Sequence, residues 1–131
     1  MKPSVLLPAA SLLSLVLIMI HLTGDVLLQA EGSVKFPIPV VVFAVWLYGT
    51  LMLPDRVAGY IIMLLGGLFS AAMIVIHSRT GVVRQSGGFY FVFTMFALST
   101  TGWFTMILAA RALGLRIRAR RAAVPEAGRS R

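Results

Sequence analysis

The 131-residue chain is strongly apolar: hydrophobic residues make up 59% of it, charged residues only 12%, and its mean hydropathy is +0.93. A soluble domain of ordinary composition carries about 25% charged residues, so this composition argues against a soluble globular fold. Cysteine is absent, which excludes a disulfide framework, an iron–sulfur cluster and a thiolate metal site. The basic residues behind the net charge of +8 fall almost entirely outside four apolar runs.

The four runs predict four transmembrane helices. They cover residues 5–22, 36–53, 60–77 and 89–113. Each approaches or exceeds the length of about 20 residues that a helix needs to cross a hydrocarbon core of about 30 Å. The first three contain no charge, and Arg111 lies only at the inner end of the fourth. We therefore expect an all-α, single-domain four-helix transmembrane bundle over residues 1–113, followed by a basic cytoplasmic tail, 114–131, that is partly disordered.

The first run could be mistaken for a signal peptide, because it follows Lys2 and is apolar from Val5 to Ile20. A cleavage site needs small residues at its outer and inner positions. The segment Leu22-Thr23-Gly24 has Leu at the outer position. We therefore expect an uncleaved first span.

The basic residues are unevenly distributed, and their distribution predicts the topology. If the N-terminus lies inside, nine of the twelve basic residues fall in inner segments and three in outer ones. This bias satisfies the positive-inside rule, so we expect an N-in, C-in protein. Arginine outnumbers lysine ten to two, as in GC-rich bacterial genomes, which favours a bacterial cytoplasmic (inner) membrane. The inner residues are Lys2, Arg56, Arg111, Arg116, Arg118, Arg120, Arg121, Arg129 and Arg131, and the outer ones are Lys35, Arg79 and Arg84.

Small residues four apart mark the third run as a close-packing helix. Gly66 precedes Ser70 by one helical turn, and Gly67 precedes Ala71 by the same interval. Such spacing lets the backbones of membrane helices approach closely. The hydroxyls at positions 99–101 of the fourth run are expected to bond carbonyls of their own helix.

Two aromatic residues with polar groups lie deep in the second run. Trp46 and Tyr48 stand ten and twelve residues into it, and a polar group at that depth usually finds a partner. Either both pack into the bundle, or Tyr48 lines a polar cavity.

Two histidines and an aspartate are the one group of polar residues in the sequence that could bind a ligand or carry out chemistry. His21 ends the first run and His77 the third, so alternating topology places both at the outer face. Asp25 follows His21 by one helical turn on the same side if the helix continues. Imidazole is the commonest metal ligand, and ionisable groups near membrane depth often mark function.

Helix geometry separates the alternatives for this constellation. Adjacent helices lie about 8–10 Å apart and diagonal ones roughly 11–14 Å apart. Diagonal histidines could hold a haem between them, whereas adjacent ones could share a divalent metal with Asp25. A proton-handling site is a third interpretation. The structural alternative is that both imidazoles bond water or loop carbonyls, and that Asp25 pairs with Arg79 or Arg84.

The basic cluster Arg116, Arg118, Arg120 and Arg121 follows the fourth run directly. Such clusters attract anionic lipid head groups, at roughly 1 kcal/mol per basic residue. Nucleic acid is not expected as a partner, because the charge is tethered at the membrane and no aromatic reading surface accompanies it.

Several short motifs resemble those of a family of small bacterial four-span integral membrane proteins. They are HLTxD at 21–25, VWLYGT at 45–50, GYII at 59–62, IH at 76–77 and GGF at 87–89. The resemblance implies the architecture and not a chemistry. Members often carry a second acidic residue where this chain has Gly24, so the resemblance does not supply a multi-carboxylate metal site.

Two functional classes follow. The first is a non-catalytic subunit or assembly partner of a larger membrane complex, contacting other membrane-protein subunits or a second copy of itself. The second is a metal- or haem-binding membrane protein that uses His21, Asp25 and His77 for electron transfer or sensing.

Overall fold

The computed structural model of the chain describes residues 3–27, 37–80 and 88–127. Residues 1–2, most of the two predicted outer loops and the last four residues lie outside this part. The predictions made for Lys2, Lys35, Arg84, Arg129 and Arg131 therefore stay predictions.

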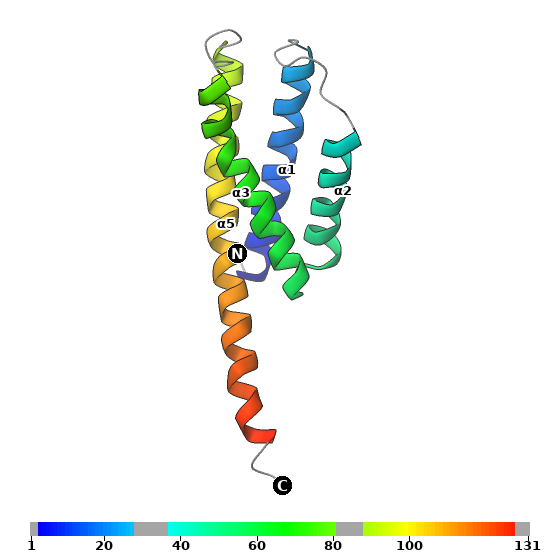
Figure 1. Cartoon of the computed structure of the whole chain (residues 1–131), viewed down its shortest axis with the longest axis vertical. Coiled ribbons are helices and arrows are strands. Elements are labelled where there is room, and N and C mark those ends of the chain that lie inside the picture. Colours follow the sequence, from blue (N-terminus) through cyan, green and yellow to red (C-terminus); the bar gives the residue numbers. More distant parts are fainter. Residues whose placement is uncertain (1–2, 28–36, 81–87, 128–131) are drawn as a thin grey trace.

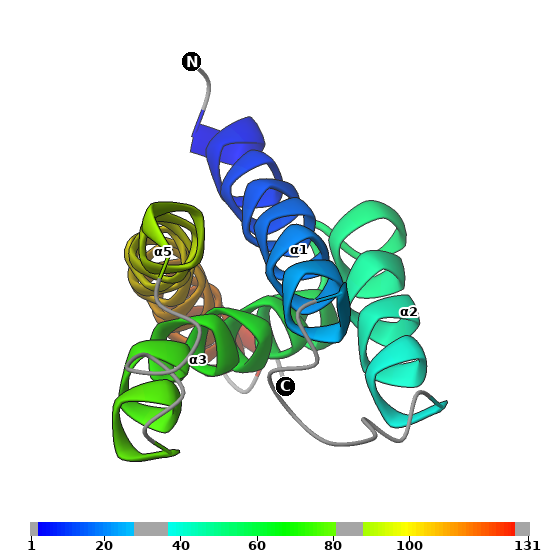
Figure 2. The same ribbon diagram turned by 90° about the horizontal axis from the view of Figure 1, so that it is seen from above.

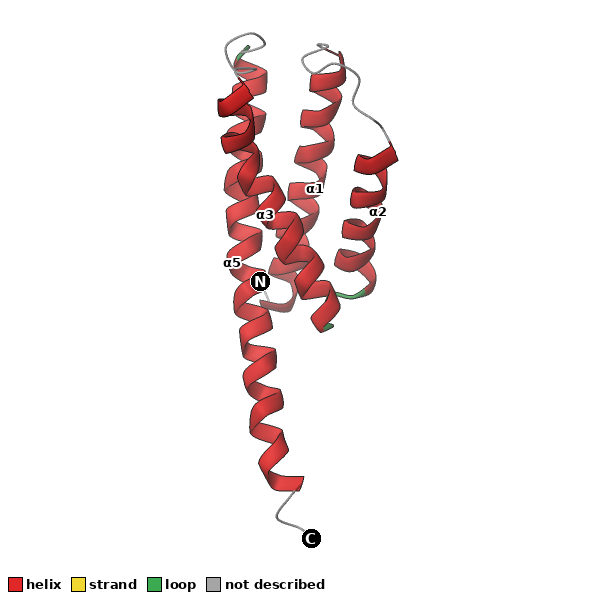
Figure 3. Cartoon of the chain, viewed as in Figure 1, coloured by secondary structure: helices red, strands yellow, loops and turns green. Residues whose placement is uncertain are grey.

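Four helices account for nearly all of the described residues, which contain no strand (Figure 3). They are α1 (Pro3–Leu27), α2 (Pro37–Met52), α3 (Val57–Thr80) and α5 (Phe89–Ala127). The helices run alternately up and down, so the start of α1 and the extended end of α5 point the same way (Figure 1). The predicted all-α helical bundle is confirmed.

The bundle has the cross-section of a flattened rhombus. Around it, α5 contacts α1, α1 contacts α2, α2 contacts α3 and α3 contacts α5, the last pair most extensively. Across it, α1 also contacts α3, whereas α2 and α5 have no contact between their described residues. The view from above shows α1 and α3 on the short diagonal (Figure 2). Of the two helix pairs that lie diagonally across the bundle, α1 and α3 are therefore in contact and α2 and α5 are not, within the described residues.

Three of the four helices are long and apolar enough to cross a membrane, as in an integral membrane protein. Their spanning segments are Val5–Thr23, Val57–Ser78 and Phe89–Ala122. The apolar part of α2, Val40–Met52, is shorter. At 1.5 Å per residue, the 16 residues of α2 rise about 24 Å, less than a core of about 30 Å. The second span predicted over 36–53 is thus a short helix.

A tight turn ends α2 and starts α3. Pro54 cannot continue the α2 ladder, because it has no amide hydrogen. The Arg56 N–H donates to the Leu53 carbonyl at 3.1 Å, and the Tyr60 N–H donates to the Arg56 carbonyl at 3.1 Å. A Cβ at Gly59 would collide with the Leu53 carbonyl oxygen. Glycine at this position therefore permits the reversal between the two helices.

The last helix does not stop at Leu113, where the apolar run ends. It continues through the basic segment to Ala127, a total of 39 residues and about 58 Å. Gly114 costs a helix about 1 kcal/mol relative to alanine, but the Leu, Arg and Ala residues around it are strong helix formers. The first part of the predicted tail is consequently an extension of α5 beyond the other helices (Figure 1).

Candidate functional site

The interior of the bundle contains a closed cycle of hydrogen bonds between α1 and α2. The Trp46 indole N–H donates to Ser11 Oγ at 2.8 Å, and the Thr50 hydroxyl donates to the Trp46 carbonyl at 2.9 Å. Ser11 Oγ and Thr50 Oγ1 lie 2.8 Å apart. Since the Thr50 proton is already used, the Ser11 hydroxyl donates to Thr50. All three side chains are buried, so each polar group is satisfied without water.

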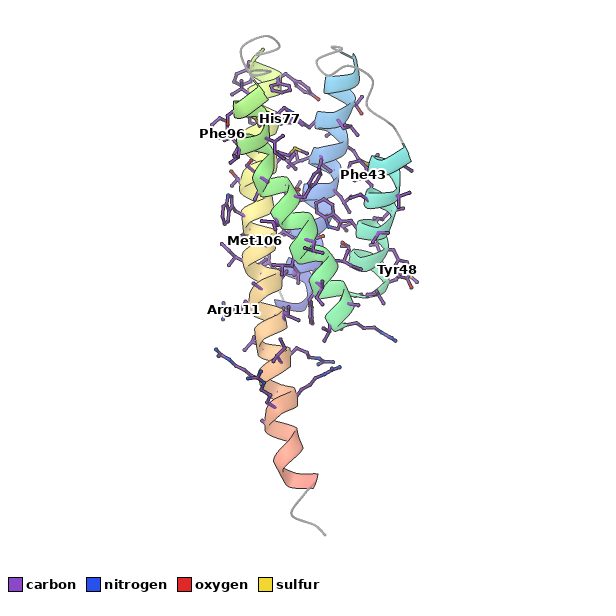
Figure 4. The ribbon with its side chains drawn as sticks, viewed as in Figure 1. Phe43, Tyr48, His77, Phe96, Met106 and Arg111 are labelled. Atoms are coloured by element: carbon purple, nitrogen blue, oxygen red, sulfur yellow. The ribbon has the colours of Figure 1, made fainter. Side chains whose placement is uncertain are left out.

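The two aromatic residues of the second run have different roles. Trp46 is buried and bonded in this cycle, as expected for a polar group at that depth. Tyr48 instead points outward and is half-exposed (Figure 4). Neither interpretation of Tyr48, as a packed core residue or as the lining of a polar cavity, fits this placement.

Hydroxyl groups also connect α1 and α3 to α5. Ser14 donates to the Ala10 carbonyl at 3.1 Å, so its 3.2 Å bond with Thr105 is donated by Thr105. Thr100 and Thr101 bond carbonyls of their own helix, as predicted. Ser99 differs, because its hydroxyl reaches the Ala71 carbonyl of α3 at 3.5 Å. These buried hydroxyls join helices within the chain.

Glycines at the crossing of α3 and α5 bring the two backbones together. A Cβ on Gly67 would lie 2.9 Å from the Gly102 carbonyl oxygen, and a Cβ on Gly102 would lie 2.5 Å from the Ala71 nitrogen. Ser70 and Ala71 are buried at this crossing. Gly66 faces the other way, where a Cβ would overlap the Trp46 ring. The four small residues predicted to pack helices therefore all pack inside the chain, and none of them presents a surface to a partner.

His21 and His77 meet at one end of the bundle, on the short diagonal. Their exposed fractions are 2% and 3%. The ring centroids lie 5.0 Å apart in an edge-to-face arrangement. Phe91 of α5 packs against both rings, at 4.9 Å from His21 and 5.6 Å from His77. The sequence placed the two histidines at the same level, and the structure brings their rings into contact.

Hydrogen bonds fix the orientation of both imidazoles. The Thr94 hydroxyl donates to the Phe91 carbonyl at 3.0 Å, so the 3.2 Å bond between His21 Nδ1 and Thr94 Oγ1 is donated by His21. His77 Nδ1 lies 3.0 Å from the Met73 carbonyl, which can only accept. Both rings therefore carry a proton on Nδ1, and in the neutral state the Nε2 atom of each has the lone pair.

This geometry distinguishes a shared ion from a haem. Two imidazoles that bind one tetrahedral ion through Nε2, at about 2.0–2.1 Å, place their ring centres about 5 Å apart. The observed separation of 5.0 Å has that size. A haem plane between the rings would need the space that the ring contact fills. Haem ligation by His21 and His77 together therefore does not fit this arrangement.

Asp25 lies in the last turn of α1, one turn beyond His21, and its side chain is outside the described part. Among the described side chains, no set of three His, Cys, Asp or Glu residues could hold a metal ion. A third His, Cys, Asp or Glu ligand for an ion at the histidine pair would therefore have to be Asp25 or a residue whose side chain lies outside the described part.

The basic cluster lies on the α5 extension, where all four arginines are exposed. Successive helical residues are about 100° apart, so Arg116, Arg118, Arg120 and Arg121 project from several sides of the helix. They follow Arg111 by five to ten residues, on the part of α5 that extends below the other helices (Figure 1), and the side chains on α5 are drawn in Figure 4 with Arg111 labelled.

One candidate feature was not recognised in the sequence. Along α5, residues separated alternately by four and three positions form two largely apolar seams, which lie on opposite faces of the helix. The inward seam is buried against α1 and α3, and the outward seam is exposed except at Gly114, which is half-buried. The inward seam consists of Phe91, Met95, Leu98, Gly102, Thr105 and Ala109, and the outward seam of Phe89, Phe93, Phe96, Thr100, Trp103, Ile107, Ala110, Gly114 and Ile117.

No family model, curated protein or solved structure shows significant similarity to this chain.

Proposed function

We propose that this chain is a non-catalytic subunit of a larger complex in the bacterial cytoplasmic membrane, and that it binds its partner through the outward seam of α5. In this proposal both termini lie in the cytoplasm, as the distribution of basic residues predicts. The observation that carries the proposal is the regular 4-3 spacing of the outward seam from Phe89 to Ile117.

This spacing is the one that packs helices side by side. Apolar residues alternating at intervals of four and three generate the seam of a left-handed helix pair, and most transmembrane helices pack in this hand. On the inward face, α5 uses the same spacing against its neighbours within the chain. The outward seam repeats that pattern with larger side chains, and no described helix covers it.

The length of the seam also supports a protein partner. From Phe89 to Ile117 it rises about 42 Å, more than a hydrocarbon core of about 30 Å. Its last member, Ile117, is exposed on the extension of α5, among arginines. Lipid chains cover apolar residues inside the membrane but not beyond it, so a helix that follows the whole seam accounts for Ile117 as well. The partner is thus a long helix of another membrane subunit.

Site-specific crosslinking tests this interface. A photoreactive benzoylphenylalanine is placed at Phe96 in the seam or at Tyr48 on α2, which have the same exposed fraction of 55%. After irradiation of native membranes, a discrete product is expected at Phe96 and not at Tyr48. Its mass distinguishes another subunit from a second copy of this chain. Equal products at both positions, or none at Phe96, would refute the interface.

The histidine pair supports a second candidate function, a single-ion metal site. The supporting observation is that both Nδ1 atoms donate to groups of the bundle, which is how second-shell bonds orient metal-binding imidazoles. A divalent ion bound by His21, His77 and Asp25 would serve sensing or electron transfer. Elemental analysis of protein from native membranes tests it: a stoichiometric metal that is lost in His21→Ala and in His77→Ala supports the site, and equal metal in all three proteins would exclude it.

A further inference from the structure

An apolar cavity of about 500 Å³ lies between α1, α2 and α3. This volume is within the range of about 300–1,000 Å³ typical of ligand sites. The lining has one ionisable side chain, His21, and is otherwise aliphatic, aromatic or glycine apart from the thioether of Met73. The one polar atom of the Trp46 ring is turned away from the cavity to bond Ser11. The cavity therefore offers contact to apolar groups and almost nothing to water.

Its walls explain why the cavity persists. Gly66 lacks a side chain, so the Trp46 ring lies directly against the α3 backbone and forms the inner wall. Val42 and Val45 on α2 and Leu65 on α3 line the cavity and are also exposed on the outside of the bundle. The cavity is thus continuous with the face between α2 and α3 that would contact lipid.

The contents of such a cavity follow from its surroundings. A water molecule needs two to four polar partners, and apolar cavities stay dry. An empty cavity would cost its lining residues their dispersion contacts. In a membrane, the medium at the outer face of α2 and α3 is lipid hydrocarbon, which can enter through the continuous apolar face. We infer that the cavity binds one acyl chain of a membrane phospholipid.

This inference depends on the membrane setting of the helices and not on a partner subunit. The occupant is a flexible hydrocarbon chain, because the lining gives dispersion contacts from three helices and no fixed pattern of polar groups. Trp46 reports directly on that occupant, since it is buried in the bundle with 2% exposure yet lines the cavity.

Fluorescence quenching by lipids with brominated acyl chains tests the inference. The chain has two tryptophans, so Trp103→Phe leaves Trp46 as the sole reporter and Trp46→Phe leaves Trp103, which is 53% exposed on α5. Both full-length variants are reconstituted into phosphatidylcholine vesicles with and without bromine on the chains. Comparable quenching of the two tryptophans is expected despite their different exposure. Quenching of Trp46 far below that of Trp103 would refute an acyl chain in the cavity.

Cavity-filling variants supply the matched control. In the Trp103→Phe background, Val42→Phe fills the cavity from α2 and Leu65→Phe fills it from α3. Either should roughly halve the quenching of Trp46, because the added ring occupies the space of the lipid chain. Val75→Phe, an equal change at an exposed α3 position outside the cavity, should leave it unchanged. If both filling variants and the control quench alike, the cavity is not the binding site.

Native mass spectrometry identifies the source of the chain. Protein released from membranes in mild detergent should retain one phospholipid, and this adduct should be lost in Val42→Phe and kept in Val75→Phe. An isoprenoid adduct with the same dependence would refute the phospholipid as occupant, and so would the absence of any adduct that depends on Val42.

Discussion

Replacing Gly102 by alanine should destabilise the protein, whereas replacing Gly114, on the same helix, by alanine should stabilise it. At Gly102, a Cβ would lie 2.5 Å from the Ala71 nitrogen, 2.7 Å from Ser70 Cβ and 2.8 Å from the Gly67 carbonyl oxygen. Ordinary contacts of a Cβ begin at 3.4 Å, so α3 and α5 must separate in Gly102→Ala by roughly 1 Å. At Gly114 on the same helix, a Cβ would meet nothing within 4 Å.

The free-energy cost of overpacking and the free-energy gain in helix propensity can be compared directly. Overpacking that displaces backbone typically costs about 1–3 kcal/mol, and replacing glycine by alanine returns about 1 kcal/mol in helix propensity. Gly102→Ala should therefore lower the free energy of unfolding by up to about 2 kcal/mol. Gly114→Ala has the propensity gain alone and should raise it by up to about 1 kcal/mol. Because both changes are identical in chemistry and lie on one helix, the difference between them isolates the crossing.

The free energy of unfolding can be measured by titrating the protein from mild detergent into sodium dodecyl sulfate while following its helical circular dichroism. The slope of the transition should stay constant across the series, so that midpoints report stability. Equal stabilities of Gly102→Ala and Gly114→Ala would refute the close crossing of α3 and α5.

Three further predictions follow from individual contacts. Ser11→Ala removes two bonds of the cycle and leaves the Trp46 N–H buried without its acceptor. At about 0.6 kcal/mol for each of the two interhelical bonds plus about 1–3 kcal/mol for the unsatisfied donor, we expect a loss of about 2–4 kcal/mol in the same titration. Ser70→Ala, at an equally buried serine whose hydroxyl has no partner among the described residues, should cost nothing. Thr94→Val removes the acceptor of His21 Nδ1 and should weaken zinc binding, measured by calorimetry, by about tenfold or more; unchanged affinity would argue against an ion at the pair. Replacing Arg116, Arg118, Arg120 and Arg121 by glutamine should abolish the protein's preference for spin-labelled phosphatidylglycerol over phosphatidylcholine, measured by electron paramagnetic resonance. The reason is that each arginine supplies roughly 1 kcal/mol of attraction to an anionic surface. An unchanged preference would exclude the cluster as the lipid site.

The apolar runs were sufficient to predict the helices, but not where three of them end, because α1, α3 and α5 continue beyond their runs. The second run, 36–53, ends within one residue of α2, because Pro54 follows it directly and its missing amide hydrogen stops the helix locally. The end of the hydrophobic run at Leu113 was a poor guide to the end of α5, since helix propensity does not depend on hydrophobicity and the Arg- and Ala-rich segment favours the helix as strongly. Hydropathy thus located the membrane-spanning part of each helix rather than the helix itself.

The sequence predicted that His21 and His77 lie at the same end of the bundle, but not that their rings are in contact. Alternating helices necessarily bring His21 and His77 to the same end, whatever the packing. Their contact depends on α1 and α3 lying on the short diagonal of the bundle, whereas Gly67 and Gly102 set the close approach of α3 and α5 along one side of it. The small residues of α3 predict that another helix packs closely against it. They do not identify that helix, because the sequence of one helix does not specify which helix lies opposite.

The outward seam of α5 could not be recognised in the sequence for a different reason. In a soluble helix, an apolar stripe stands out against polar residues on the other faces. Residues 89–113 are apolar on all sides, so the 4-3 spacing of the aromatic residues lacks contrast. Only the structure shows that one seam is buried and the other exposed.

The crossing of α3 and α5 also couples stability to the histidine pair. His77 lies on α3 ten residues beyond Gly67, while Phe91 and Thr94, which hold the ring of His21, lie on α5 on the same side of the crossing. A wedge that separates the two helices at Gly102 should therefore move His77 relative to His21. Since His21 and His77 are the two histidines of the chain, their imidazole nitrogen resonances can be resolved without ambiguity. Gly102→Ala should shift both sets of resonances and Gly114→Ala neither. Unshifted resonances in a destabilised Gly102→Ala protein would show that α1, and not the crossing, positions the pair.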